Sequence, residues 1–141
     1  MNKIMLLISV TIIMILALSA CGAAASERSV TIACADLYYQ KNVSRQVEVS
    51  SGDTLVVTLC SNPAANSFNW LETPEISAKS IVQKDHKLYP PATSDPKDPS
   101  GKEVWTFQVN GKGDSTIKFT YNRPWEGTQS QGIFTLTVNA K

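Results

Sequence analysis

The stretch from Glu103 to Val109 reads EVWTFQV, and its pattern decides the fold class. Trp105, Phe107 and Val109 fall on one side of an alternating pattern, and polar residues fall on the other. Successive side chains of a β-strand point to opposite faces of the sheet, so this alternation predicts a strand with one buried face. The same pattern recurs at residues 54–60, 115–121 and 132–138.

Shorter runs rich in β-forming residues lie between these strands. They cover Val30–Ala35, Gln46–Val49, Phe68–Leu71 and Lys79–Gln83. Turn-forming residues separate the runs, as in Ser51-Gly52-Asp53 and in the segment 110–114. No segment after Ser26 holds a helical period over three turns. The sequence therefore predicts an all-β domain, an immunoglobulin-like antiparallel β-sandwich of seven to eight strands.

The tryptophans and the histidine have structural interpretations in this fold. We expect Trp70 and Trp105 in the core, because the first falls where immunoglobulin-like domains bury a Trp and the second shares a face with Phe107. His86 lies among charged residues, and we expect it in a solvated segment. Trp125 lies in the loop after the strand at residues 115–121, and a position in the core or at a corner of the sandwich is the alternative.

Composition limits the classes of function. The chain has 141 residues, of which 43% are hydrophobic and 18% are charged, and its net charge is +1. This length fits one folded domain, and the charge argues against a nucleic-acid partner. One histidine cannot supply a metal site built from several His ligands. We expect no metal, no cofactor and no enzymatic activity.

The N-terminus has the features of an export signal. Lys3 precedes an apolar run from Ile4 to Leu18, which is too short to span a bilayer core of ~30 Å comfortably. Small residues then precede Cys21, a pattern that resembles the bacterial lipobox. We expect residues 1–20 to be a lipoprotein signal peptide, 21–28 to be the lipidated Cys21 with a tether, and 29–141 to be the domain. An ordinary signal peptide or an uncleaved anchor is the alternative.

The remaining cysteines, Cys34 and Cys60, agree with an exported protein. A pair of cysteines outside the cytoplasm often forms a disulfide, and this one would stabilise the fold by roughly 3 kcal/mol in the chain-entropy model. Two free, buried thiols remain the alternative, because sequence alone does not place the two Cα atoms within bridging distance.

Two connections are longer than a sandwich needs, and a third carries an unusual sequence. The long connections are Leu88–Lys102, with four prolines and the ending DPSG, and Asn122–Gln131, which contains RPW. Residues 61–70 read SNPAANSFNW. Loops on a rigid sandwich are where binding function concentrates.

At these loops the chain resembles the chagasin-like inhibitors of papain-family cysteine peptidases, from about Val30 to Lys141. The family carries Asn-Pro-Thr-Thr-Gly followed by Trp, a Gly-x-Gly-Gly loop and Arg-Pro-Trp. The first motif is altered here, with alanines for both threonines, no glycine and one inserted residue. The second keeps only its last glycine, and the third is complete.

The resemblance implies a reversible inhibitor, in which three loops form a wedge that occludes the active-site cleft of a papain-like cysteine peptidase. It implies that the first loop lies over the catalytic cysteine, with the other two loops on either side. The peptidase-binding residues are then Asn62, Pro63, Ala64, Ala65, Asn66, Ser100, Gly101, Arg123, Pro124 and Trp125. Trp and Arg are enriched at binding hot spots.

We therefore expect a monomeric inhibitor held on the extracytoplasmic face of a membrane through lipid on Cys21. The alternative is a noncatalytic immunoglobulin-like binding or adhesion lipoprotein, which would keep the strands and need none of the loop motifs.

Overall fold

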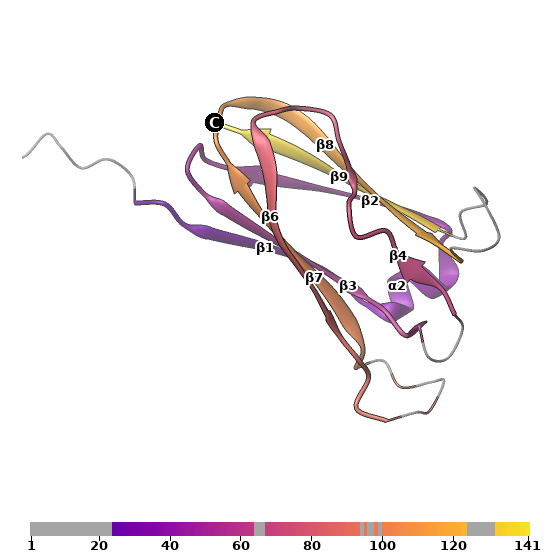
Figure 1. The fold of residues 1–141 in the computed structure, drawn as a ribbon. Coiled ribbons are helices and arrows are strands. Elements are labelled where there is room, and N and C mark those ends of the chain that lie inside the picture. Colours follow the sequence, from indigo (N-terminus) through magenta and orange to yellow (C-terminus); the bar gives the residue numbers. More distant parts are fainter. Residues whose placement is uncertain (1–23, 64–66, 94, 96–97, 99, 124–131) are drawn as a thin grey trace, which may run out of the picture.

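Two sheets pack face to face in a computed structural model that describes residues 24–63, 67–93, 95, 98, 100–123 and 132–141. The first sheet has, in spatial order, β1 (Glu27–Ile32), β3 (Thr54–Cys60), β7 (Lys102–Val109) and β6 (Ile81–Tyr89). The second has β2 (Asn42–Val49), β9 (Gly132–Ala140), β8 (Gly113–Asn122) and β4 (Asn69–Trp70), and β5 (Glu75–Ile76) also pairs with β8. The helix α2 (Cys34–Tyr39) leads from β1 in one sheet to β2 in the other (Figure 1).

The predicted β-sandwich is confirmed, with two differences in detail. The described residues form nine strands rather than seven to eight, because two-residue strands add to the count. Two strand pairs, β1 with β3 and β2 with β9, run parallel, so both sheets are mixed rather than purely antiparallel. Alternation of residue types reports which face a side chain takes and carries no information about strand direction.

The strand from Thr54 to Cys60 has the predicted bounds, whereas β6 is longer than predicted. The prediction ended this strand at Gln83, and the structure continues it to Tyr89. The pairing of β6 with β7 shifts register between Gln83 and Asp85, so Lys84 is an extra residue at a β-bulge. The bulge breaks the period of two, which is why the sequence pattern appeared to stop there.

The prediction of a strand over Val30–Ala35 is wrong in its second half. The strand begins earlier, at Glu27, and ends at Ile32, and a six-residue helix starts at Cys34. Asp36 closes the first turn, because its Oδ2 accepts the N–H of Ala33 at 3.2 Å. A helix of six residues is too short to give a recognisable helical period in the sequence.

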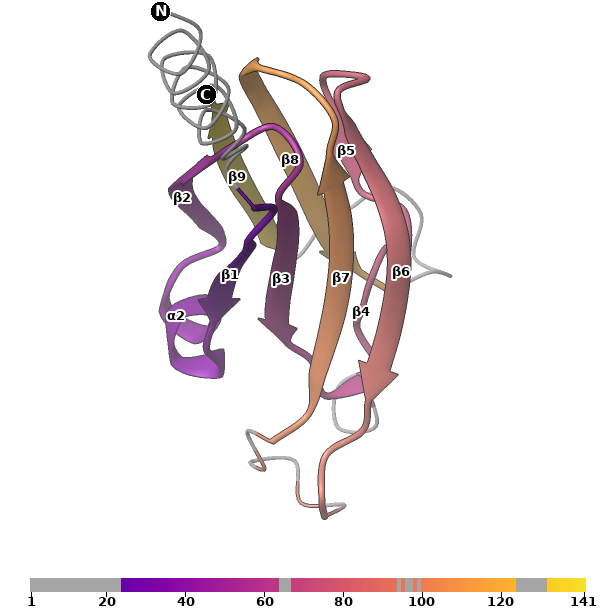
Figure 2. The same cartoon turned by 90° about the vertical axis from the view of Figure 1, so that its left-hand side faces the viewer.

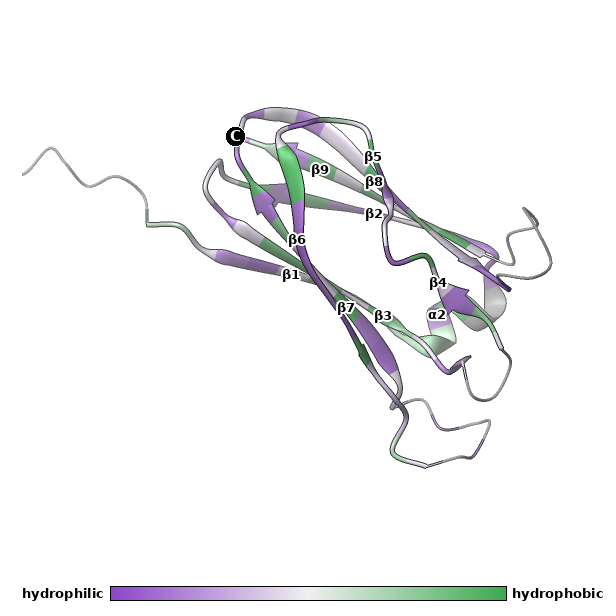
Figure 3. Ribbon diagram, in the orientation of Figure 1, coloured by the Kyte–Doolittle hydropathy of each residue, from purple (hydrophilic) through white to green (hydrophobic). Residues whose placement is uncertain are grey.

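The core lies between the sheets and is aromatic at its centre. Trp105, Phe107, Phe119 and Phe134 are fully buried, and Trp105 meets the edge of Phe119 at 5.0 Å between ring centroids. Trp70 is 2% exposed, so both predicted core tryptophans are confirmed. Each such side chain contributes roughly 1.5–3 kcal/mol by burial. Figure 3 shows the hydrophobic and hydrophilic residues alternating along the strands.

Among the described residues, Ser26 is already held in the fold, although it lies in the segment predicted to be a tether. The Ser26 backbone N–H and hydroxyl donate to Oδ1 of the buried Asp53 at 2.9 and 3.0 Å. A hydrogen bond from the Ser50 backbone N–H, together with those from Ser26, holds the pKa of the Asp53 carboxyl below its ordinary value. No helix within the described ranges is long and apolar enough to cross a membrane.

Candidate functional site

The described parts of the segments that carry the three motifs lie at one end of the sandwich (Figure 1). The first loop (residues 61–68) joins β3 to β4, the second (90–101) joins β6 to β7, and the third (123–131) joins β8 to β9. The strand ends that flank these loops lie at the same end of the molecule, opposite the C-terminus (Figures 1 and 2). Chain topology thus gathers residues that are some sixty positions apart in sequence.

A backbone hydrogen bond and a side-chain hydrogen bond join the first loop to the second. The Ser61 N–H donates to the Gly101 carbonyl at 3.0 Å, and the Asn62 side-chain amide donates to the Asp98 carbonyl at 3.2 Å. Gly101 is buried against this junction, where a Cβ atom would stand 2.1 Å from the Ser61 carbonyl oxygen. Only glycine lets the two loops approach so closely.

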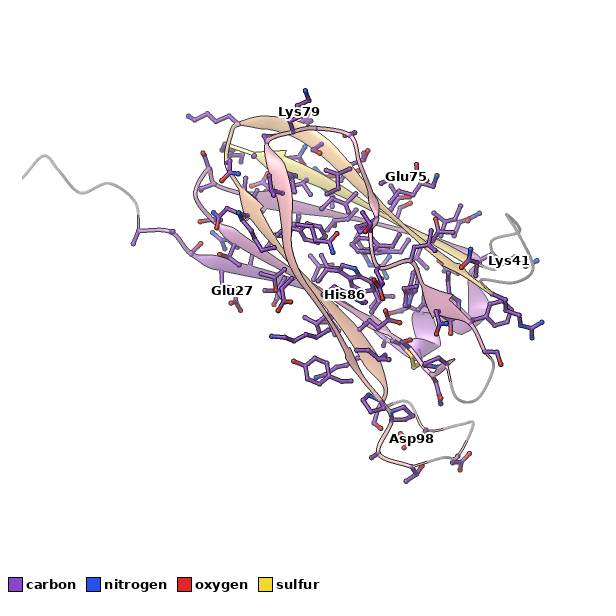
Figure 4. The ribbon with its side chains drawn as sticks, viewed as in Figure 1. Glu27, Lys41, Glu75, Lys79, His86 and Asp98 are labelled. Atoms are coloured by element: carbon purple, nitrogen blue, oxygen red, sulfur yellow. A yellow bond between two sulfur atoms is a disulfide. The ribbon has the colours of Figure 1, made fainter. Side chains whose placement is uncertain are left out.

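Asp98 organises the second loop from within. Its Oδ2 accepts the backbone N–H and the hydroxyl of Thr93, both at 2.8 Å, and its Oδ1 accepts the Ser100 N–H at 2.9 Å. Hydrogen bonds from Ser100 and Thr93 favour the ionised carboxylate and hold the pKa of Asp98 well below its ordinary value. Figure 4 places Asp98 in this loop, beyond the ends of β6 and β7. The ionised side chain thereby ties Thr93 to Ser100 across the described part of the loop.

Aromatic contacts join the first loop to the third. Strand β4 pairs with the end of β8, with Trp70 opposite Tyr121. The Phe68 ring lies 5.5 Å from that of Tyr121, and the Arg123 guanidinium lies 4.3 Å from the centre of the Phe68 ring. Arg123 therefore stacks on an aromatic residue of its own chain. The first loop contacts both of the others.

The first loop is also closed at its base. The Trp70 indole N–H donates to the Cys60 carbonyl at 2.9 Å, which connects the residue before the loop to the strand after it. In the structure Cys60 is joined to Cys34 by a disulfide, with Cα atoms 5.0 Å apart. Within the loop, the Ser67 N–H donates to the Pro63 carbonyl at 2.8 Å, and Ser67 has a φ of 60°.

A buried polar cluster that was not predicted from the sequence lies under the loops. Glu103, at the start of β7, is 3% exposed and accepts the Ser61 hydroxyl on Oε1 at 2.6 Å. His86 Nε2 lies 2.8 Å from Oε2 of the same carboxylate. The segment around His86 is exposed, as expected, but the bulge at Lys84 turns the His86 side chain itself inward, and that side chain is 16% exposed. The EVWTFQV alternation could have indicated that Glu103 is buried, because it puts Glu103 on the same face as Trp105.

The structure describes five of the ten residues expected to bind a peptidase, and all five lie at this end. They are Asn62, Pro63, Ser100, Gly101 and Arg123. The other five lie outside the described residues, as does Cys21. These are Ala64, Ala65, Asn66, Pro124 and Trp125.

Metal-binding side chains do not gather in this part of the molecule. The described residues contain no group of three or more His, Cys, Asp or Glu side chains that could hold a metal ion. The groups described at this end are hydrogen-bonding loop residues and aromatic side chains, and such groups suit binding to another protein.

Comparison with known proteins connects this geometry to a family. The family model described as "Chagasin family peptidase inhibitor I42" matches residues 48–138. Those residues include the first and second loops and Arg123-Pro124-Trp125. Comparison with curated protein sequences gave no significant match.

Solved structures share the fold at low sequence identity. The cysteine protease inhibitor EhICP2 from Entamoeba histolytica superposes with a TM-score of 0.61 at 17% identity, over 85% of this chain and 100% of its own. Amebosin gives 0.51 at 17% identity, over 84% and 100%. PbICP-C, solved in complex with falcipain-2, gives 0.53 at 14% identity, over 81% and 98%.

The family and these neighbours include peptidase inhibitors rather than enzymes. With more than half of the chain matched by the family model, and with the motif loops at one end of the expected sandwich, the chain belongs to the chagasin family of peptidase inhibitors.

Proposed function

We propose that this protein inhibits papain-like cysteine peptidases reversibly, by filling the active-site cleft with its three loops. The observation that carries the proposal is the gathering of Asn62, Gly101 and Arg123, one from each motif, at one end of the sandwich. Membership of an inhibitor family supports it, and so does a structural neighbour solved in complex with falcipain-2.

The loops have separate roles in this proposal. The first loop lies over the catalytic cysteine of the peptidase, where the small side chains of Ala64 and Ala65 permit close approach. The third loop presents Trp125 to the wall on the leaving-group side, and the second loop contacts the opposite side. A Trp side chain offers a large, rigid surface with few rotatable bonds, as hot-spot residues do.

Preformed loops support tight binding. Ordering a flexible loop on association costs free energy, and a loop already held in its bound shape avoids most of that cost. In the described parts of the first and second loops, the hydrogen bond from Asn62 and those that Asp98 accepts hold the chain in place in the free protein. The stacking of Arg123 on Phe68 does the same between the first and third loops.

We further propose that lipid on Cys21 holds the protein on the extracytoplasmic face of a membrane. Ser26 is fixed beside Asp53, at the start of β3, whereas the first loop leaves the end of β3. The attachment point and the loops are therefore at opposite ends of the same strand. Six extended residues reach at most ~20 Å. The anchor would thus present the loops away from the membrane surface.

Inhibition kinetics with papain test the function. The soluble fragment from Ala24 to Lys141 contains every described contact and is titrated against papain hydrolysing a small peptide substrate. We expect competitive inhibition, with KM raised and kcat unchanged, because the loops and the substrate need the same cleft. Absence of inhibition at micromolar concentrations would contradict the proposal, and binding without inhibition would favour the adhesion alternative.

A further inference from the structure

We propose that His86, Glu103 and Ser61 form a hydrogen-bonded relay that positions the first loop for peptidase binding, an inference that rests on the proposed function. Ser61 is the first residue of the first loop, whereas His86 and Glu103 lie on strands outside the three loops. The three residues come from three neighbouring strands of one sheet, with His86 on β6, Glu103 on β7 and Ser61 directly after β3.

The carboxylate of Glu103 is the centre of the relay. Its side chain is only 5% exposed, and its oxygens accept from Ser61 at 2.6 Å and from His86 Nε2 at 2.8 Å. Each carboxylate oxygen thus has its own donor. A buried carboxylate costs desolvation free energy that an apolar residue of similar size would not cost. Unlike an apolar residue, the carboxylate holds the Ser61 hydroxyl in a defined position relative to the His86 ring, because it bonds both groups.

The His86 ring is itself held in place. It stacks on the Trp105 indole, with 4.5 Å between centroids and 24° between the ring planes, and the two residues are opposite one another in the β6–β7 pairing. The Trp105 indole N–H donates in turn to the Glu72 carbonyl at 3.0 Å. With the side chain 16% exposed and its ring clamped on one face, His86 is a fixed support rather than a mobile one.

The relay ends at the first loop. Ser61 is 1% exposed and precedes Asn62-Pro63, and its N–H also donates to Gly101 at the base of the second loop. Glu103 is two residues beyond Gly101. The Glu103 carboxylate therefore bonds directly to the first residue of the first loop and to β6, the strand that leads into the second loop. Through Ser61 it is also connected to Gly101, at the end of the second loop. Moving any of these groups moves the position from which Asn62 reaches the second loop.

A double-mutant cycle on papain inhibition tests the relay. Ser61→Ala removes one donor, and His86→Phe removes the other while keeping a ring on Trp105. We expect each single variant to raise the inhibition constant about five- to tenfold. Ser61 and His86 are coupled through Glu103, so we expect the double variant to fall short of the product of the single effects by at least about threefold. His86→Gln, which retains an N–H donor, should recover part of the loss.

Val109→Ala is the matched control for a general loss of stability. Val109 is fully buried at the other end of β7, so this variant lowers the unfolding free energy and should leave the inhibition constant unchanged. If Val109→Ala weakens inhibition as much as His86→Phe does, or if the effects at residues 61 and 86 multiply independently, the relay has no positioning role.

Hydrogen exchange in the free protein separates the relay from the proposed function. We expect His86→Phe to speed exchange at the Ser61 N–H, which bonds Gly101, and to leave the Gly52 N–H, which bonds Val109 at the far end, unchanged. If the wild-type fragment does not inhibit papain, the proposed function fails, and this exchange pattern still tests the relay. Equal exchange at Ser61 in wild type and variant would overturn it.

Discussion

Gly101 allows the first and second loops to share a hydrogen bond at their base. Its own carbonyl accepts the Ser61 N–H, and its missing Cβ leaves room for the Ser61 carbonyl. The obstructing atom belongs to the backbone of a neighbouring strand end, so it cannot turn aside as a flexible side chain would. This residue shows how the loop arrangement depends on one position that makes no side-chain contact at all.

Gly101→Ala should therefore separate the two loops. We expect a loss of about 1–3 kcal/mol in unfolding free energy, since the added methyl forces a backbone shift in a closely packed site. Urea unfolding measures it. Gly111→Ala, whose Cβ would lie 3.2 Å from the Ser80 Cβ at the other end of the sandwich, is the control and should cost less. Equal losses at the two positions would contradict the account of Gly101.

Trp125 is the residue from which we expect the largest single contribution to binding. Trp125→Ala should weaken papain inhibition by roughly 2 kcal/mol or more, about thirtyfold, if the indole is a hot spot. The inhibition constant measures this, with the melting temperature as the check that the fold is intact. An unchanged inhibition constant would remove Trp125 from the binding site.

Asp98 predicts a pH dependence in the second loop. The pKa of Asp98 is lowered on folding by the hydrogen bonds from Ser100 and Thr93, so its contribution to stability is fully present above its ordinary value of 3.8 and is lost as the pH falls through the lower folded value. Carboxyl NMR titration should show Asp98 still ionised at pH 3.8. A midpoint at 3.8 would contradict the hydrogen-bonded geometry.

Single residues also mark the limit of what the sequence could predict. Asn62, Gly101 and Arg123 were predicted as peptidase-binding residues through family motifs, because each motif has a recognisable spacing. His86 was not found, because a one-residue bulge reverses the faces of every residue after it, and nothing in the run from Lys84 to Lys87 identifies the extra residue.

At the scale of elements, the disulfide connects the first turn of α2 to the last residue of β3. Cys60 is also the residue whose carbonyl accepts the Trp70 indole N–H. The bridge therefore restrains the chain where the first loop begins.

Removing the bridge should destabilise the protein measurably. Cys34 and Cys60 are 26 residues apart, and a loop of this length predicts a loss of about 3 kcal/mol in unfolding free energy when Cys34→Ser and Cys60→Ser are combined. Urea unfolding of the fragment from Ala24, which lacks Cys21, measures it. A reducing agent should lower wild-type stability and leave the double variant unaffected. Insensitivity of the wild type to reductant would show that the thiols are free.

The strands were predicted better than the other elements for a physical reason. In β3, β7, β8 and β9 one face is buried in the core, so alternation is complete and the bounds lie within a few residues of those predicted. The helix α2 was missed because its packing depends on the disulfide and on neighbouring strands rather than on a period of its own. The parallel pairing of β1 with β3 depends on tertiary topology, which local patterns do not encode.

At the scale of the whole molecule, the sandwich holds the motif-bearing loops and the start of the domain at opposite ends. The three loop-bearing ends of the strands lie together, and the N-terminal end of β1 lies opposite them (Figure 1). The family resemblance predicted the clustering of the loops. Residue patterns alone predicted only that loops exist, since the position of a loop depends on how the strands are arranged in the two sheets.

The proposed lipid on Cys21 gives a prediction for the full chain. When the 141-residue chain is expressed in bacteria, we expect it to enter the detergent phase in a phase-partition experiment, because two or more acyl chains anchor a protein stably. Cys21→Ala should move it to the aqueous phase or leave it unprocessed. Identical partitioning of the wild type and the variant would show that Cys21 carries no lipid.

Binding to papain with its cleft open or filled tests the central claim most directly. By calorimetry, the fragment from Ala24 should bind papain whose catalytic cysteine carries only a small blocking group. It should not bind papain whose cleft is filled by a covalently attached peptidyl inhibitor, because the three loops need that space. Equal affinity for the two forms would mean that the loops bind outside the cleft, and the occlusion account would be wrong.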